Sequence, residues 1–474
     1  MDATQSVSPA ISKPNRLDEP ASFELLAPEI LLQIVTNLPG LDTLWNLLCA
    51  SPHVWRLFSS HALAITEGII SGPNSILPLR VQEIVRAVIL TRSKALPFQN
   101  LEEFQVRFMR SMMPHGAPKG AVLKVIGPKA LSASTVSVPV LRSVVVTAYQ
   151  ASALSQACLA SCLARIRDPS FKPLHADPSP QYGGDYGDDP EVWVPAWDRE
   201  FIGKPVQVVD AGQPSWVEEM RALRAVWLIQ LMGEVQCLVA DEAETVGWPD
   251  EDIHRLSKMD TVDVVTELPE TLLSREEEVK SMVQYIATRG DATKETFYRL
   301  PRAPSASASP RWITASPKRT HPPRIVRGFC RNGKFHPLPK GSAIPEDGTP
   351  PFKWPDITDS SKWGQTESFL ASTSQGIFTF RCLTAGDHLY SPTPIPGVKF
   401  ESFRPLGFAF WDRRRMHLLG LSNGISYKGS HPDVYLFAFE SILPPGEVAS
   451  LKAELRRSRA QQLSTSITRQ FPSP

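Results

Sequence analysis

Proline sets the strongest limit on how this chain can fold. The chain has 44 prolines among 474 residues, against 27 glycines, and at about 9% they run well above the usual ~5%. Because proline inside a helix or a central strand removes a backbone donor, we expect broken helices, turns and extended linkers over long stretches. Twelve of the prolines fall in residues 301–355, interleaved with serine. This segment is predicted to be a linker or an irregular wrapped segment.

The overall charge argues against two classes of partner. Lys and Arg number 50 and Asp and Glu 49, so the formal net charge is +1. Such a balance gives no general attraction to nucleic acid or to an anionic membrane. Residues 241–280 hold 13 acidic and 4 basic residues, whereas residues 311–340 hold 8 Lys/Arg and no acid. Both are interpreted as solvated runs; the alternatives are that they dock on each other, or that Lys318-Arg319 belongs to a nuclear-import signal.

The cysteines and the apolar runs indicate an intracellular protein. Six scattered cysteines do not make a disulfide scaffold, and Cys158 and Cys162, four residues apart, are interpreted as small buried residues of one helix. Residues 1–20 lack the apolar run of a signal peptide. No segment is expected to reach the ~20 apolar residues that cross a membrane. We therefore expect a soluble, reduced, cytoplasmic and/or nuclear protein.

Motifs for catalysis and metal binding are weak. Gly420-Leu421-Ser422-Asn423-Gly424 matches the Gly-x-Ser-x-Gly pattern of a nucleophile elbow, but no helical pattern follows it, as that motif requires. There is no Cys-x-x-Cys, His-Glu-x-x-His, Walker loop or dinucleotide fingerprint. The sequence therefore predicts no catalytic residue, no cofactor and no metal, and a protein that is not an enzyme.

Three short helices are predicted after a disordered arm at residues 1–21. Pro28 suits the first position of one helix, Asp42 can cap a second, and Ser51-Pro52 opens a third, within a module of residues 22–67. Three helices this short cannot bury all their apolar side chains against each other. Part of the apolar surface must therefore face a partner or the following domain. The residues in question include Leu26, Pro28, Ile30, Ile34, Leu44 and Leu47.

This module resembles an F-box. The resemblance is carried by Leu26, Glu29, Ile30, Ile34, Leu38, Asp42, Leu47 and Cys49. Ala27 stands where the family has its first proline, and Ala50-Ser51-Pro52 with the late Trp55 resembles a variant of fungal F-box-like proteins. The resemblance implies binding to the Skp adaptor of SCF-type cullin–RING ubiquitin ligases. The implied adaptor contacts are Leu26, Pro28, Ile30, Ile34, Leu44 and Leu48.

The rest of the chain is predicted to be a mainly helical body at residues 68–300, then the proline-rich segment, then a β-rich part at residues 356–445. Helices are indicated by apolar spacing at 80–91 and 149–166 and by starts near Asn100, Ser215 and Ser274. Alternating apolar residues predict strands at 376–383, 406–410, 416–421 and 434–439, the middle pair forming a hairpin around an exposed Arg413-Arg414-Arg415 turn. That hairpin also resembles one in fungal F-box-like proteins. Residues 446–474 are predicted to be a basic helix and a frayed tail.

Together these features predict an α+β fold that is mainly helical, with a three-helix F-box at the N-terminus, an irregular helical middle and a β-hairpin in the C-terminal part. The implied function is that of a non-catalytic substrate receptor, linked through the Skp adaptor to the cullin and holding an unknown target protein. No leucine-rich, WD or kelch repeat identifies a target-binding domain. The alternative is an interaction or scaffold protein whose F-box-like helices serve only its own fold.

Overall fold

The structure is a computed structural model of the whole chain. It describes residues 25–108, 125–175, 198, 204–206, 208–260, 273–289, 373–384, 398–421 and 437–470. The predicted arm at 1–21, the proline-rich segment at 301–355 and Ser422 lie outside these residues.

The N-terminal module consists of three helices, as predicted. They are α1 (Pro28–Thr36), α2 (Leu41–Ala50) and α3 (Pro52–Ser71). Pro28 and Pro52 occupy first turns, where a missing backbone N–H costs nothing. Ser51 caps α3, because its Oγ accepts a hydrogen bond from the Val54 N–H at 3.2 Å. Helix α3 bends at His61, whose backbone is not helical.

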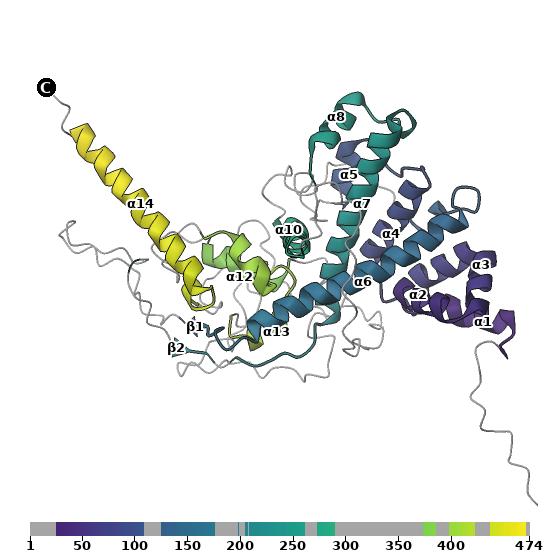
Figure 1. The fold of residues 1–474 in the computed structure, drawn as a ribbon, viewed down its shortest axis with the longest axis horizontal. Coiled ribbons are helices and arrows are strands. Elements are labelled where there is room, and N and C mark those ends of the chain that lie inside the picture. The colour runs from purple at the N-terminus through teal and green to yellow at the C-terminus, as the bar shows by residue number, and fades with distance from the viewer. Residues whose placement is uncertain are drawn as a thin grey trace, which may run out of the picture.

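A helical body follows, and most of it packs around one central helix. Its members are α4 (Leu79–Arg92), α5 (Leu101–Phe108), α6 (Val138–Ile166), α7 (Trp216–Val246), α8 (Asp250–Lys258) and α10 (Leu273–Ala287). Helix α7 is contacted by α4, α6, α8 and α10 (Figure 1). It begins at the predicted capping box, in which Ser215 and Glu218 satisfy each other's backbone N–H groups.

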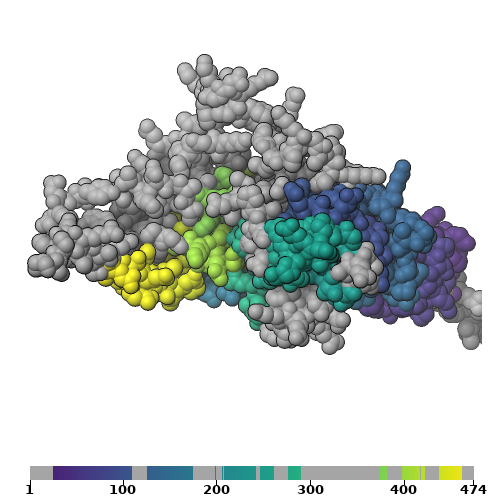
Figure 2. Space-filling model, turned by 90° about the horizontal axis from the view of Figure 1, so that it is seen from above, coloured from purple at the N-terminus to yellow at the C-terminus, as the bar shows by residue number. Residues whose placement is uncertain are grey.

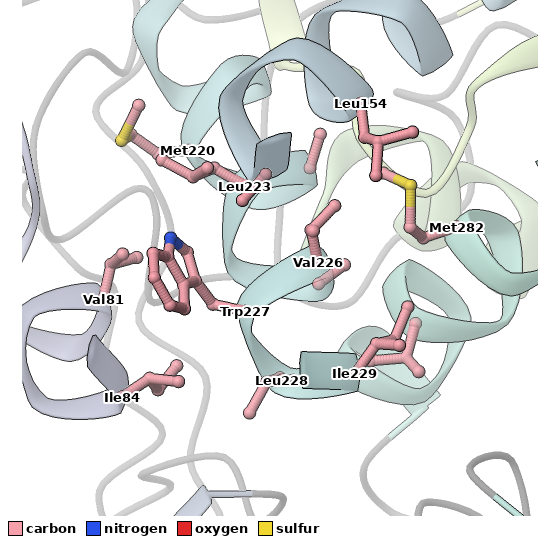
Figure 3. Close-up of a cluster of buried hydrophobic side chains, with 14 of the residues drawn as sticks. Val81, Ile84, Leu154, Met220, Leu223, Val226, Trp227, Leu228, Ile229 and Met282 are labelled. Carbon is pink, nitrogen blue, oxygen red and sulfur yellow. The ribbon is translucent and has the colours of Figure 1, made fainter. Parts of the chain in front are cut away.

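The core around α7 is filled by large side chains from several helices. Trp227 is buried and lies beside Val81 and Ile84 of α4, while Met282 of α10 meets Leu154 of α6 (Figure 3). Buried apolar residues of the N-terminal module, the body and the C-terminal part form one continuous cluster. This continuity fixes the relative positions of elements that lie far apart in the sequence.

Helices α6 and α7 run for 29 and 31 residues, so the expectation of broken helices was wrong for this part of the body. Proline enters α6 only in its first turn and is absent from α7. Residues Trp216–Asp241 of α7 are long and apolar enough to cross a membrane by length and composition, contrary to expectation. However, 78% of the most apolar window is buried inside the protein. A central position in the core accounts for this composition.

The predicted α+β fold class is wrong, because the described C-terminal part is helical and shows no β-hairpin. Its elements are α12 (Gln375–Thr384), the 3₁₀ helix η7 (Phe400–Leu406), α13 (Arg413–Leu418), the 3₁₀ helix η9 (Phe439–Ser441) and α14 (Pro445–Gln470). In the described residues, strands are limited to β1 (Leu174–His175) and β2 (Lys204–Pro205), which pair antiparallel. The fold is therefore mainly helical.

Two local causes explain the wrong strand predictions at 376–383 and 406–410; of the strand predicted at 434–439, residues 434–436 lie outside the described residues. At 376–383 the strand prediction assumed a period of two for a short apolar run, but such runs do not distinguish strand from helix. Ser374 caps α12 instead, accepting from the Ile377 N–H at 3.2 Å and donating to the Phe408 carbonyl at 2.8 Å. At 406–411 the side chains are buried on all sides rather than alternately. Gly407 adopts φ +80°, which turns the chain back on itself.

The C-terminal aromatic residues form their own dense part of the core. Phe380 lies 5.2 Å from Phe400 and 5.4 Å from Phe403, ring centroid to centroid, and Phe403 lies 4.9 Å from Phe439. Helix α6 and helix α10 both contact η7, so this region packs on the body. The N-terminal module and α14 lie at opposite ends of the molecule (Figure 2).

Candidate partner-binding surface

Helix α1 presents one buried and one exposed apolar face. Leu31 and Val35 are completely buried, which fixes the orientation of the helix. Ile30 is 49% exposed and Ile34 is 37% exposed; four residues apart, they lie on the same side of the helix. Pro28 is also exposed, and Leu25, just before the helix, is 83% exposed. We call these four exposed residues (Leu25, Pro28, Ile30 and Ile34) the α1 strip.

On helix α2 the predicted contact residues are buried. Leu44 is fully buried and Leu48 is 4% exposed, because α2 packs against α6 and α3. Ser152 of α6 donates a hydrogen bond to Asp42 Oδ2 at 3.4 Å, which ties the two helices at this point. The chain itself therefore covers two of the residues that were predicted to contact an adaptor.

The predicted contact residues are thus separated by the fold. Pro28, Ile30 and Ile34 remain on the surface, whereas Leu26 is half-buried and packs on the core. Helix α6 can approach α2 closely because small residues recur at helical spacing on the side that carries Ser152. These residues are Ala148, Ala151, Ser152 and Ser155, all buried. Nothing local in the sequence of α2 shows that this distant helix will cover it.

Trp55 belongs to the motif that the sequence indicated, but its partner on α6 has no sequence signal. Trp55 is 36% exposed, and the Arg142 guanidinium of α6 lies 4.2 Å from the centroid of its ring. Arg142 Nη2 also donates to Ser59 Oγ at 3.3 Å. An exposed cation–π contact contributes about 0.5–1 kcal/mol. Trp55 therefore joins α3 to α6 and is not counted in the α1 strip.

A second group of polar residues lies deep in the molecule, between α7, α10 and α13. Arg415 Nε lies 2.9 Å from Glu218 Oε1, and Arg224 Nη2 lies 2.7 Å from Glu278 Oε2; all four side chains are buried. The prediction of an exposed Arg413–Arg415 turn was therefore wrong. The reason is pairing, since a buried arginine is tolerated when a carboxylate and carbonyls satisfy its fork of donors.

Asp412 shares this buried environment. Burial and the nearby charge of Glu218 raise the pKa of Asp412 to about 6, although hydrogen bonds from the Arg415 backbone and the Ser215 side chain act in the opposite direction. The Asp412 N–H in turn donates to Glu218 Oε1 at 3.0 Å. Because Asp412 and Glu218 are enclosed, they anchor the C-terminal part on α7 and are not in contact with the cavity described next.

A small cavity of about 250 Å³ borders Arg415. It lies between the C-terminal end of α6 and the residues just after it, residues 208–211, and α13 with the residue that follows. The lining is mixed, with Ile166, Arg167, Asp168, Phe171, Val208, Asp210, Ala211, Arg415 and Leu419. No sequence pattern marks it, because these three segments meet only through tertiary packing.

Candidate groups for metal or thiol chemistry are few in the described residues. No cluster of three or more His, Cys, Asp or Glu side chains there is arranged to hold a metal ion. Cys158 and Cys162 are both buried on α6, as interpreted from their spacing. Hydrogen bonding to Cys162, together with burial, raises the pKa of the Cys158 thiol, so the reactive thiolate is disfavoured.

Known proteins add no further guide to this surface. Comparison of the chain with family models, with curated proteins and with solved structures gave no match in any of the three.

Proposed function

We propose that the protein is an F-box-type substrate receptor, in which the α1 strip binds a Skp-type adaptor and thereby links the chain to the cullin of a ubiquitin ligase. The observation that supports this is the exposure of Ile30 and Ile34 on a helix whose adjacent side is fully buried at Leu31 and Val35. A helix held in place by its core, with apolar residues left outward, fits the helix-in-groove mode of recognition. The F-box resemblance of the same residues names the adaptor.

The strip has the right scale for part of an interface. At about 25 cal/mol per Å² of apolar surface, covering the exposed parts of Ile30 and Ile34 would contribute roughly 2–4 kcal/mol. A stable interface of standard size buries about 800 Å² on each partner. The contact must therefore extend beyond the strip to polar neighbours such as Gln33 and Asn37, both exposed.

In this role the protein would carry out no covalent chemistry. Its contribution would be proximity, because a target held on the receptor presents its lysines to the ubiquitin-conjugating subunit as an intramolecular partner. The helical body around α7 would serve as the rigid connection between adaptor and target.

The test is direct binding of the purified full-length chain to a purified Skp-type adaptor by calorimetry. We expect Ile30→Ala/Ile34→Ala to weaken binding at least tenfold, because most of the apolar contact of α1 is removed. Val209→Ala is the matched control, since Val209 is 43% exposed and lies outside the N-terminal module. Unchanged affinity in the double variant, or no binding by the wild-type chain, would contradict the proposal.

The burial of α2 favours a second candidate, a scaffold protein whose F-box-like helices serve only its own fold. Leu44 and Leu48 are already covered by this chain, so only half of the predicted contact set is free for a partner. In that case the wild-type chain does not bind the adaptor, and the α1 variants lose a different interaction or none. The calorimetric experiment separates the two candidates.

A further inference from the structure

The cavity beside Arg415 and the contact with α2 lie at different points along α6. Ser152 of α6 contacts α2, whereas Ile166, the last residue of the helix, lines the cavity. At a rise of 1.5 Å per residue these points are about 21 Å apart along the helix. One continuous helix therefore separates the α2 helix of the N-terminal module from the cavity and fixes the spacing between them.

The size and walls of the cavity suit one large apolar side chain. Its volume of about 250 Å³ is below the ~300–1,000 Å³ of pockets that hold small-molecule ligands. Ile166, Phe171 and Leu419 are buried apolar residues of its lining. Val208 and the adjacent Val209 are 36% and 43% exposed, so apolar surface continues outward from the wall.

The charged side chains that line the cavity are two arginines and two aspartates, and of these only Asp168 is outside the ion pairs of the described residues. Arg167 and Asp210 form an ion pair at 3.0 Å with 41% and 54% of their side chains exposed, and such surface pairs are worth about 0–1 kcal/mol. Asp168 adds a second carboxylate, fully exposed to water. Arg415 does not offset it, because Glu218 already neutralises that guanidinium.

Both rim carboxylates are ionised at neutral pH. Hydrogen bonds from the Ser170 hydroxyl and N–H lower the pKa of Asp168. Burial acts to raise the pKa of Asp210, but hydrogen bonds from Arg167 and Gly212 lower it overall. The two Ser170 bonds both end on Asp168 Oδ1, which leaves Oδ2 able to accept from a cation.

Arginines hold the 211–213 wall in place before any ligand arrives. Arg415 donates to the Gly212 carbonyl at 3.2 Å and to the Gln213 carbonyl at 2.9 Å. Arg414 donates to the Ala211 carbonyl at 3.3 Å. A wall fixed in this way loses little conformational entropy on binding, which favours recognition by a small contact.

We propose that this cavity is the target-recognition site and that it binds a peptide segment with a bulky apolar side chain next to a lysine or arginine. The apolar side chain fills the space between Ile166, Phe171 and Leu419, and the neighbouring cation pairs with Asp168 or Asp210. Calling the peptide a target rests on the proposed receptor function. The binding itself does not, and it can be measured without the adaptor.

The test uses a phage-displayed library of random peptides, each about a dozen residues long, selected on the purified full-length chain. Selection on the Ala211→Phe variant serves for subtraction, because the added ring occupies the cavity while the Ala211 carbonyl keeps its bond to Arg414. We expect selected peptides to be enriched in Phe, Trp, Leu or Met beside Lys or Arg. Enrichment of acidic residues at that place, or the same peptides from both proteins, would overturn the proposal.

Selected peptides are then synthesised with a fluorophore and titrated by fluorescence polarisation. Asp168→Asn and Asp210→Asn keep an acceptor oxygen but remove one charge each, so each is expected to weaken binding roughly threefold at low salt. Ala211→Phe is expected to abolish binding. Equal affinity in all three variants would overturn the site even if each melts like the wild type.

The variant Ile30→Ala/Ile34→Ala separates this proposal from the receptor function. It should bind the peptide with wild-type affinity, because no residue of the N-terminal module lines the cavity. Peptide binding without adaptor binding would retain the cavity as a recognition site and reject the ligase role. Adaptor binding without any peptide selection would reject the cavity alone.

Discussion

Helix α1 and helix α13 differ from each other in burial in the direction opposite to the one that their polarity suggests. Ile30 and Ile34 of α1 are apolar and partly exposed, whereas Arg415 of α13 is charged and only 2% exposed. The difference lies in the contacts of each side chain. Arg415 bonds a carboxylate and two carbonyls in the interior, whereas about half of the Ile30 surface is left exposed. Burial in this protein therefore follows the available partners rather than the polarity of a residue alone.

The largest effect should come from removing the buried ion pair between Arg415 and Glu218. Arg415→Ala removes the cation that pairs with the buried carboxyl group of Glu218 and leaves that group with its backbone N–H partners. We therefore expect it to lower the free energy of unfolding by about 3–5 kcal/mol. Urea denaturation followed by circular dichroism measures the change. Arg414→Ala, one residue away, should cost only about 1 kcal/mol, since Arg414 is only half-buried and donates to the Ala211 carbonyl. Similar losses in both variants would show that the pairing with Glu218 is not what matters.

A matched pair of leucine and isoleucine truncations compares the two faces of the N-terminal module. Leu44→Ala leaves a cavity between α2 and α6 and should lower the free energy of unfolding by about 3 kcal/mol. Ile30→Ala removes a partly exposed side chain and should change it by less than about 0.5 kcal/mol. The same urea titration gives both values. Equal losses would mean that Ile30 is covered in solution, and the α1 strip would not be a free surface.

Asp412 should make the free energy of unfolding depend on pH. Its pKa is about 6 in the folded protein against 3.8 as the ordinary value, so between about pH 4 and 6 the folded state binds more protons than the unfolded state. Its contribution to stability is therefore complete below about pH 4 and is lost as the pH rises through about 6. In wild type the free energy of unfolding should therefore fall by about 1–3 kcal/mol more between about pH 4 and 6 than it does in Asp412→Asn. Urea titrations at a series of pH values give the two curves, and parallel curves would contradict the assignment.

The smallest expected effect concerns the contact of Trp55 with Arg142. A double-mutant cycle with Trp55→Ala and Arg142→Ala should give a coupling of about 0.5–1 kcal/mol. The attraction comes from the quadrupole of the ring and acts over a short distance. We therefore expect the coupling energy to change little with salt concentration. A coupling near zero would leave Trp55 available to extend the α1 strip.

Local signals in the sequence predicted several helices of the body, although α8 was not predicted and α6 begins eleven residues earlier than expected. Ser215 and Glu218 marked the start of α7, and Asn100 marked the start of α5, where its Oδ1 accepts from the Glu103 N–H at 2.7 Å. Apolar spacing located α4. These predictions succeeded because capping and helical periodicity depend on residues only a few positions apart.

The strand predictions failed where tertiary contacts overrode a short pattern. Gly376 of α12 lies so close to the Phe408 backbone that a Cβ atom at this position would come within 2.3 Å of the Phe408 carbonyl oxygen. Only glycine allows that approach, and no property of residues 376–383 alone reveals it. The candidate cavity was equally hidden, since Ile166, Val208 and Leu419 come from three separate segments.

The sequence by itself determined that three short helices open the chain and that they carry more apolar surface than they can bury together. Only the tertiary structure decided which helix keeps the excess: α6 covers Leu44 and Leu48 of α2, and Ile30 and Ile34 of α1 remain outward. The physical reason is that helix formation is governed by neighbours along the chain, whereas burial depends on which distant surface arrives with a complementary shape.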